Sequence, residues 1–309
     1  VLHVGRYAKK VRDLPDDSIY MILYPFYTIS FLLAWLLRNR KLVVWVKSDS
    51  EALYRARPYR TGFDYVRYNL RWVVSPIRNF LFRAISAYLL KPALVFYTGN
   101  ITFRTHDHRN QHEIISCSNF NRDVSLVKNH FTDTICFVGS ESPFKGIQVL
   151  LRALQHLKPE RPLTLHIIGM SSFTHPTNLR LSTGLEIIFH GRIYDRKQYY
   201  EILSQTDILV MPSFGEKQGK VHLEAMSAGV VPVCADSGGT YKSMDNHYNG
   251  LLFTPGNHIE LAGQIDLLYR ESAFYRKLQA NALRHLDTLS VERLIGNMAS
   301  VIHNYFAYR

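Results

Sequence analysis

The chain has 309 residues, 47% of them apolar, and a formal net charge of +12. This composition excludes a disordered or low-complexity protein, and the length is sufficient for two domains of about 100–200 residues each. The positive charge predicts a polyanionic partner: a nucleic acid, an anionic membrane surface or a phosphorylated substrate. Ten Lys or Arg but only three acidic residues lie between positions 51 and 110. That segment is either an ordinary solvated basic face or a surface for such a partner.

The cysteines and the apolar segments indicate a cytoplasmic protein. Cys117, Cys136 and Cys234 are far apart, odd in number and without metal-ligand spacing, as expected of small core residues in a reducing compartment. The most apolar run, Thr28–Leu37, has about ten residues, whereas a membrane-spanning helix needs about 20. No signal-like segment opens the sequence.

The first part of the chain alternates apolar strand patterns with helical patterns. We expect strands over 18–26, 41–49, 93–99 and 113–119, and helices up to about 37 and over 65–90, the second interrupted by Pro76. Strands that alternate with helices indicate right-handed crossovers and a parallel sheet. A polar stretch then leads to about Thr132, and we place the domain boundary between residues 130 and 131.

The second part of the chain repeats this alternation more regularly. The predicted strands are 134–139, 163–169, 185–191, 207–213, 231–236 and 250–256, and the predicted helices are 146–157, 196–205, 220–229 and the segment from about 259. We therefore expect a doubly wound α/β domain over 131–290. A C-terminal helix over 291–309 is expected to pack back toward the domain formed by 1–130.

Polar residues and glycines follow the predicted strands of this second domain. They are Gly139, Gly169, Gly191–Arg192, Ser213–Glu216 and Asp236–Gly239. The carboxyl ends of parallel strands meet at one edge of a sheet, where doubly wound domains bind their ligands. We expect these five loops to form one binding crevice.

The stretch from Pro212 to Gly239 suggests the ligand. The helix after Gly219 starts with free N–H groups, which can hold a phosphate, and Lys145 can add a full positive charge. Glu224, one turn into that helix, can accept hydrogen bonds from the two hydroxyls of a ribose. Glu216 can reach the hydroxyls of a group attached beyond the phosphates. Together these residues predict a nucleotide-sugar site, although each taken alone is equally typical of a solvated surface residue.

The segment EKQGKVHLEAMSAGVVPVCADSGG resembles the Glu-x7-Glu signature of retaining glycosyltransferases of family 4, also called glycosyl transferases group 1. FVGSESPFKG, LHIIG, IIFHGRI, DILVMPS and NGLLFTPGN match the same family in order and spacing. The likeness covers nearly all of Asp133–Leu268, whereas residues 1–130 are similar only in strand order. It implies the GT-B fold, in which two Rossmann-like domains face a cleft.

The resemblance implies a role for each matching residue. Glu216 and Lys145 would be catalytic, and no metal or cofactor would be needed. The sugar would pass with retention to a glycan or lipid-linked acceptor, in cell-surface polysaccharide or glycolipid synthesis. The partners would be the donor, the acceptor and an anionic membrane surface at the inner face of the cell membrane, without nucleic acid. The donor-binding set would be Gly139, Ser140, Lys145, Arg192, Ile193, Glu216, Gly219, Lys220, Val221 and Glu224.

The sequence departs from the family pattern at two donor-binding positions and at its start. Ser140 stands where the family usually has Arg, and Lys217 stands where it has Gly. These changes keep open a second hypothesis, a non-catalytic relative that binds a nucleotide or a glycan. No Gly-rich loop precedes Ser18. Either about three strands precede Val1 and are absent from this numbering, or the acceptor domain is compact and divergent.

Overall fold

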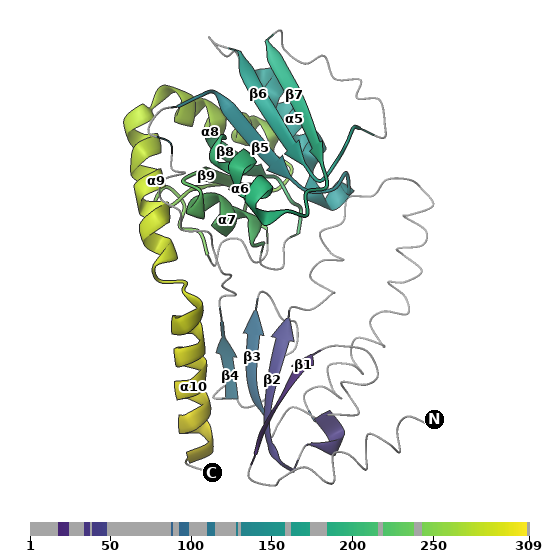
Figure 1. Cartoon of the computed structure of the whole chain (residues 1–309), viewed down its shortest axis with the longest axis vertical. Helices are drawn as coiled ribbons and strands as arrows, with labels where there is room; N and C mark the ends of the chain where they lie inside the picture. The colour runs from purple at the N-terminus through teal and green to yellow at the C-terminus, as the bar shows by residue number, and fades with distance from the viewer. Residues whose placement is uncertain are drawn as a thin grey trace. The chain divides into compact units, whose positions relative to one another are not determined.

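The computed structural model divides the chain into two compact units, which are described here one at a time (Figure 1). Unit 1 comprises Val1–Arg55, Tyr59–Ile115 and Glu292–Arg309, and unit 2 comprises Ala56–Pro58 and Ser116–Val291. The chain thus passes into unit 2 near residue 116, whereas the sequence led us to expect the boundary at 130–131. The residues that the structure describes are 18–24, 34–37, 39–47, 88, 93–98, 110–114, 128, 131–157, 162–173, 184–215, 219–237 and 243–307.

Unit 1 contains a parallel sheet whose strands follow one another in sequence order. They are β1 (Ile19–Tyr24), β2 (Lys41–Lys47), β3 (Leu94–Thr98) and β4 (Gln111–Glu113). One face of the sheet, with Val43, Leu94 and Phe96, packs against Met298 of the last helix, α10 (Val291–Ala307). The central strands are apolar on both faces, as is typical of parallel sheets covered on both sides.

The fourth strand of unit 1 differs from the sequence prediction. The apolar run 113–119 predicted a strand, whereas β4 covers Gln111–Glu113 and pairs with Val95–Tyr97 of β3. Residues 115–119 of the predicted strand lie outside the described residues. The backbone N–H of Ile114 continues this pairing by donating to the carbonyl of Tyr97. A polar edge strand gives no hydrophobic signal, which explains the shift. The predicted helix over 65–90 lies outside the described residues except for Tyr88.

Unit 2 is a doubly wound α/β domain. Its six described strands are all parallel and are arranged in the order β10-β9-β8-β5-β6-β7. Strands β6 and β7 lie on one side of β5, and the later strands lie on the other side. The point where the strand order reverses is therefore between the neighbouring strands β5 and β8. The strands are β5 (Thr134–Val138), β6 (Leu163–Ile168), β7 (Leu185–Gly191), β8 (Ile208–Met211), β9 (Val231–Ala235) and β10 (Leu251–Phe253).

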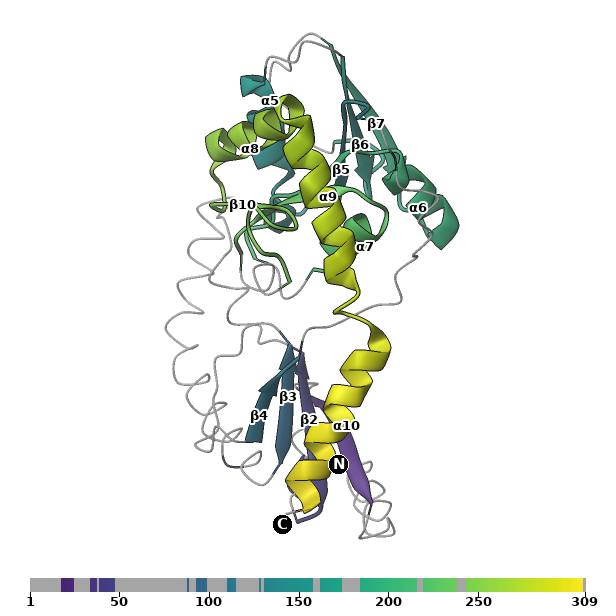
Figure 2. The same ribbon diagram turned by 90° about the vertical axis from the view of Figure 1, so that its left-hand side faces the viewer.

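Helices cover both faces of this sheet (Figure 2). On one face, α5 (Ile147–His156) and α8 (His258–Arg270) share a core with the strands, and α9 (Ser272–Leu286) contributes Tyr275 and Leu278 to it. On the other face, α6 (Arg196–Ser204) and α7 (Val221–Ser227) pack around Cys136 and Leu209. Amphipathic helices on both sides explain why the central strands are buried throughout.

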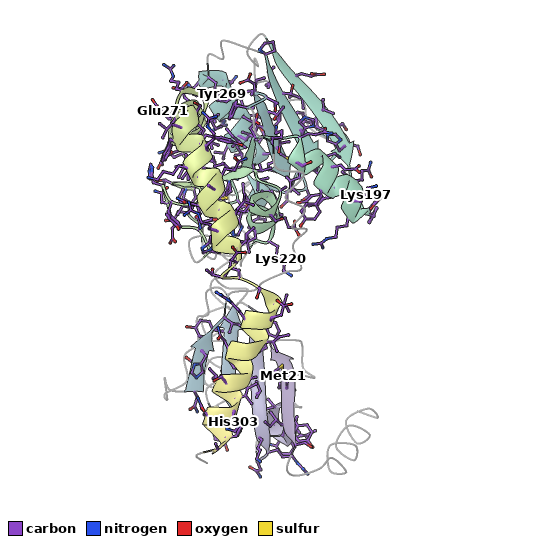
Figure 3. The ribbon with its side chains drawn as sticks, turned by 60° about the vertical axis from the view of Figure 1, so that its left-hand side comes forward. Met21, Lys197, Lys220, Tyr269, Glu271 and His303 are labelled. Atoms are coloured by element: carbon purple, nitrogen blue, oxygen red, sulfur yellow. The ribbon has the colours of Figure 1, made fainter. Side chains whose placement is uncertain are left out.

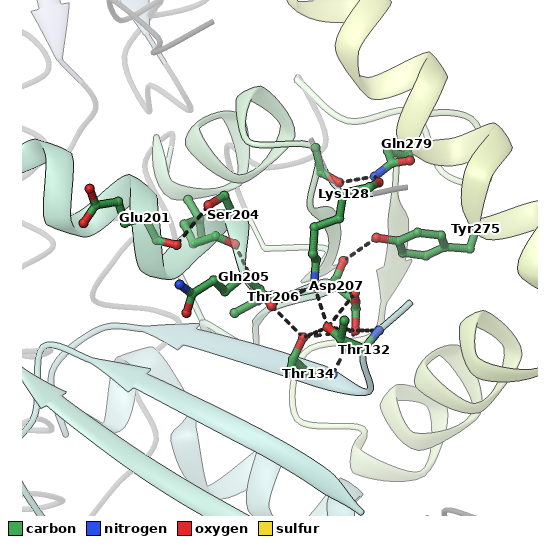
Figure 4. A network of polar contacts seen from close by, with 12 residues as sticks. Lys128, Thr132, Thr134, Glu201, Ser204, Gln205, Thr206, Asp207, Tyr275 and Gln279 are labelled. Carbon is green, nitrogen blue, oxygen red and sulfur yellow. Dashed lines mark hydrogen bonds and ion pairs between the residues drawn. The ribbon is translucent and has the colours of Figure 1, made fainter. Parts of the chain in front are cut away.

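A polar network holds the amino edge of the unit 2 sheet (Figure 4). Asp207, which is fully buried, accepts hydrogen bonds from the backbone N–H groups of Thr132 and Thr134, each at 2.9 Å. Its other carboxylate oxygen lies 2.8 Å from Nζ of Lys128, and Tyr275 donates to its backbone carbonyl. These bonds tie the segment before β5 to the start of β8.

Two further sequence expectations concern the cysteines and the membrane. Cys136 and Cys234 are buried thiols, as expected of core residues, and burial raises the pKa of the Cys136 thiol. Cys117 lies outside the described residues. Among the helices that the structure describes, none is both long and apolar enough to span a bilayer.

Candidate functional site

The loops that follow β5 and β8 are in direct contact. The backbone N–H of Phe214 donates to the carbonyl of Phe144 at 2.9 Å. Gly146 lies against the other loop so closely that a Cβ atom there would be 2.1 Å from the carbonyl oxygen of Pro212. The two loops carry the Lys145 segment and the first half of the signature segment. The fold therefore brings these parts of the predicted donor site together.

A row of glycines ends the three neighbouring strands β5, β6 and β7. The N–H of Gly139 donates to Ile168, and the N–H of Gly169 donates to Gly191. A Cβ atom at Gly169 would be 2.6 Å from the carbonyl oxygen of Gly139, so only glycine fits there. This part of the carboxyl edge consequently presents backbone rather than side chains, which allows a ligand to approach closely.

Lys145 and Ser140 lie on the loop directly after β5. Lys145 ends the short 3-10 helix η3 (Pro143–Lys145), and its side chain is half-buried. Its Cγ atom would be 3.2 Å from a Cβ atom placed on Gly139, so the lysine stem lies along the glycine that ends β5. Ser140 is exposed. Both residues are thus at the carboxyl edge, where the sequence placed them.

The start of α7 contains three predicted phosphate-binding residues. Gly219 is buried, and Lys220, which is exposed, is the N-cap residue but makes no side-chain capping bond (Figure 3). The first intrahelical bond runs from the N–H of Glu224 to the carbonyl of Lys220. The backbone amides of the first turn, beginning at Val221, therefore precede the intrahelical ladder and can serve an anion.

Glu224 makes a contact that the sequence did not predict. Its Oε2 atom accepts a hydrogen bond of 2.9 Å from the hydroxyl of Tyr199, a residue of α6. Both side chains are half-buried. Burial, reinforced by the charge of Glu224, raises the pKa of Tyr199, so the tyrosine remains a donor. Nothing in local periodicity could reveal a pair whose members are 25 positions apart on different helices.

Arg192 and Ile193, which the family resemblance places against the base of the donor, lie between β7 and α6. Arg192 is exposed, whereas Ile193 is half-buried and packs in the same apolar cluster as Val138, Tyr199 and Val221. This cluster joins the end of β5, the start of α6 and the start of α7. Ile193, predicted for the base, and Tyr199, the hydrogen-bond partner of Glu224, are consequently members of one apolar cluster.

Glu216, predicted to contact the donor sugar, lies outside the described residues, as does Lys217. The structure describes the chain on both sides of them, at Phe214 and at Gly219. Of the ten predicted donor-binding residues, the other nine are described, and all nine follow strand carboxyl ends or begin the next helix. They are Gly139, Ser140, Lys145, Arg192, Ile193, Gly219, Lys220, Val221 and Glu224.

Comparison with known sequences gives a match over this unit. The profile of the family described as "Glycosyl transferases group 1" matches residues 120–285, more than half of the chain. D-inositol 3-phosphate glycosyltransferase of Jonesia denitrificans is 29% identical over 179 residues, which are 55% of this chain and 42% of that protein. The uncharacterized glycosyltransferase MJ1607 of Methanocaldococcus jannaschii is 27% identical over 167 residues, which are 53% of this chain and 42% of that protein. The match thus spans less than half the length of these relatives.

Solved structures extend the likeness to the fold of nearly the whole chain. Sucrose-phosphate synthase from Thermosynechococcus elongatus superimposes with a TM-score of 0.70 at 18% identity, covering 99% of this chain and 78% of that one. HepE of Anabaena in complex with UDP gives a TM-score of 0.69 at 17% identity, covering 97% and 82%. These structures share the GT-B fold, as the sequence predicted. With the profile match over unit 2, they show that the chain belongs to the glycosyl transferases group 1 family.

Proposed function

We propose that this protein is a retaining glycosyltransferase that moves a sugar from a nucleotide sugar to a glycan or lipid-linked acceptor. The observation that carries the proposal is the direct contact between the Lys145 loop and the signature loop, through the bond from Phe214 to Phe144. This contact lies at the carboxyl edge of a doubly wound sheet, where such folds bind their ligands.

The residues around this contact suit a nucleoside diphosphate. Lys145 and the first-turn amides from Val221 would stabilise the diphosphate, and the glycine-ended strands leave room for it. Glu224 would accept from the ribose hydroxyls, and Arg192 with Ile193 would lie along the base. HepE, which has the same fold, is solved with UDP and with UDP-glucose. This supports a uridine nucleotide as the first donor to test.

In the proposed reaction, the bond between the anomeric carbon and the donor phosphate breaks as the acceptor oxygen bonds to the same face of that carbon. The acceptor proton passes to the departing phosphate oxygen. Lys145 and the α7 amides would supply the compensating positive charge, a role that a metal ion has in other transferases. Glu216 would hold the sugar during transfer. Activity should therefore be retained in excess EDTA, and loss of turnover that Mg²⁺ or Mn²⁺ restores would contradict this part.

The donor-site residues can be tested with two substitutions. Lys145→Ala should weaken binding of the nucleoside diphosphate by about 10- to 100-fold, since a charge-assisted contact is lost. Glu224→Ala should abolish measurable donor binding. Calorimetry with UDP, GDP and ADP gives the affinities, and Lys197→Ala, on the exposed side of α6 (Figure 3), is the matched control. Unchanged affinity in both variants would remove the site assignment.

The acceptor side distinguishes the enzyme from the non-catalytic alternative, which the change to Ser140 motivates. The full-length protein would be incubated with radiolabelled nucleotide sugars and a membrane extract. Transfer of label to lipid-linked or glycan material, or hydrolysis of the donor, supports the enzyme. Tight donor binding without either product supports the non-catalytic relative.

We also propose a cytoplasmic location with peripheral attachment to an anionic membrane surface. The support is the excess of basic residues between positions 51 and 110, next to aromatic side chains. The protein should float with vesicles that contain anionic lipid at moderate salt and should stay behind with neutral vesicles. Equal behaviour with both vesicle types would count against attachment.

A further inference from the structure

The contact between Tyr199 and Glu224 joins two helices at the predicted ribose position. Tyr199 lies in the first turn of α6, a few residues after Arg192 and Ile193, and Glu224 lies in the first turn of α7. The hydroxyl of Tyr199 donates to Oε2 of Glu224 at 2.9 Å. The bond therefore links the segment assigned to the base with the residue assigned to the ribose.

The ring of Tyr199 has packing contacts of its own, besides the hydrogen bond of its hydroxyl to the carboxylate. It makes an edge-to-face contact with the ring of Tyr200, with centroids 5.5 Å apart and an interplanar angle of 77°. Tyr200 is only 1% exposed, so it is a fixed part of the core. Tyr199 also packs in the cluster that contains Ile193 and Val221. The position of its hydroxyl is consequently set by the fold.

A carboxylate that is bonded on one oxygen has a defined plane. The terminal torsion of a glutamate is broad and is not restricted by rotamer preference alone. The bond to Oε2 removes this freedom and leaves Oε1 and the remaining lone pairs as acceptors. Two adjacent hydroxyls of a ribose require two acceptor positions at fixed separation, so orientation of this carboxylate determines how well they are bound.

We propose that Tyr199 is a positioning residue for nucleotide recognition, holding Glu224 in the orientation that binds both hydroxyls of the ribose. The proposal rests on the proposed function, in which Glu224 binds that sugar. It adds a specificity determinant: the hydroxyl of Tyr199 contributes to preference for a ribonucleoside diphosphate over its deoxy counterpart. An ordinary tie between α6 and α7 would contribute to stability but would not distinguish these ligands.

The test compares each ribonucleotide with its deoxy form. Affinities of the full chain for UDP, GDP and ADP identify the best ligand, and its 2′-deoxy form is the paired probe. Tyr199→Phe removes only the hydroxyl. This substitution should weaken binding of the ribonucleotide about tenfold and binding of the deoxynucleotide less than about threefold. The hydrogen bond to the charged Glu224 affects binding only by orienting the carboxylate that both ribose hydroxyls contact. When Glu224→Gln is already present, Tyr199→Phe should have no further effect on the ratio of the affinities for the ribonucleotide and the deoxynucleotide.

Tyr200→Phe is the matched control, since it removes a neighbouring hydroxyl that bonds Arg196 Nη2 at 3.4 Å instead of Glu224. It should change both affinities equally. Thermal unfolding of every variant separates altered recognition from altered folding.

The outcomes separate the inference from the function on which it rests. Absence of binding by all three nucleotides, or unchanged binding in Glu224→Gln, would overturn the proposed function and the inference together. Loss of the ribose preference in Glu224→Gln but not in Tyr199→Phe would overturn the inference alone. If Tyr199→Phe weakens binding of both nucleotides equally, the inference is also overturned, because the bond to Glu224 then has a purely structural role.

Discussion

Gly146 has no side chain at a place where two loops of the proposed donor site touch. Its φ angle is +68°, in the left-handed region, and a Cβ atom would be 2.1 Å from the carbonyl oxygen of Pro212. The clash is with backbone, which cannot rotate away as a side chain can. Any other residue must therefore separate the Lys145 loop from the signature loop.

Gly146→Ala should destabilise unit 2 by at least about 2 kcal/mol, of which about 1–2 kcal/mol is the cost of the left-handed conformation. Nucleotide affinity should fall as well, because the bond between Phe144 and Phe214 is strained. Urea unfolding and calorimetry measure the two effects. Gly263→Ala, at a site in α8 with nothing within 4 Å, should instead stabilise by up to about 1 kcal/mol. Equal stability of the two variants would contradict this reading.

We expect His222 to make the stability of unit 2 depend on pH. Burial, with a smaller contribution from the nearby His285, lowers the pKa of His222 to about 3. Its Nε2 atom lies 2.6 Å from Oγ of Ser243, while Nδ1 has no hydrogen-bond partner. The neutral ring that donates from Nε2–H leaves only a lone pair unsatisfied at Nδ1, which costs less than a buried charge.

The folded pKa of His222 is below the ordinary value of 6.5, so the unfolded chain binds the proton first as pH falls. The stability that the neutral ring contributes is complete above pH 6.5. It declines toward pH 3, by up to about 1.4 kcal/mol per pH unit. The free energy of unfolding of unit 2 at pH 7, 6 and 5 should show this slope. His222→Gln should reduce this slope, and the other histidines of unit 2 whose pKa is lowered by burial keep the remainder. His303→Gln, on exposed α10 surface (Figure 3), should leave the slope unchanged.

At the residue scale, the positions that the sequence indicates and the contacts that it does not indicate have different physical origins. Gly219 and Lys145 are found from their places after a strand, since a parallel sheet fixes where strand ends go. The partner of Glu224 lies on another helix, and the partner of His222 lies on the connection between β9 and β10. No periodic pattern within one helix encodes such contacts. Tyr199 and Ser243 therefore appear only in the structure.

At the scale of elements, the network at Asp207 connects the segment before β5 with β8. Its carboxylate is fully buried and accepts from two backbone N–H groups, two hydroxyls and Lys128. The exposed pair of Asp266 and Arg270 has the same N–O distance, 2.8 Å, but lies at the surface of α8. Burial, not distance, should decide how much each pair contributes.

Asp207→Ala should destabilise unit 2 by about 3–5 kcal/mol, because Lys128 and two backbone N–H groups lose their partner in a buried site. Asp266→Ala should cost less than about 1 kcal/mol, since water screens the exposed pair. Chemical denaturation measures both. A small effect at Asp207, comparable to that at Asp266, would show that the network is replaced by water.

The elements that the sequence predicted well are those buried on both faces. Strands such as β5, β8 and β9 are continuous apolar runs, and their neighbours alternate with amphipathic helices, so periodicity determines them. β4 failed because its residues Gln111–Glu113 are polar and it lies at an edge of the described sheet. Its pairing is determined by tertiary contact with β3, which overrides the local pattern.

At the scale of the whole molecule, the described buried residues of the two units belong to different apolar clusters. Val43, Leu94 and Phe96 pack with Met298 in unit 1, and none of them belongs to the clusters of unit 2. A change in one core should therefore affect that unit alone.

Met298→Asp should unfold the β2–β3 region without affecting β5–β9. Met298 is 8% exposed, and the substitution removes packing worth about 2–5 kcal/mol and adds an unpaired buried charge. Hydrogen exchange read by mass spectrometry would show fast exchange in the first region only. Ile295→Asp, at a position of the same helix that is 59% exposed, should leave exchange unchanged. Simultaneous loss of protection in both units would mean that they unfold together.

Unit 1 is interrupted in sequence, because α10 joins it only after all of unit 2 has been completed. During translation, the apolar face of β2 and β3 leaves the ribosome 193 residues (from 98 to 291) before the start of the helix that covers it. At about 5–20 residues per second this is a delay of roughly 10–40 s. For that time unit 2 is being synthesised, and the face of the sheet with Val43, Leu94 and Phe96 is without the helix that packs on it. The first unit is thus the part of this protein that most needs a chaperone during synthesis.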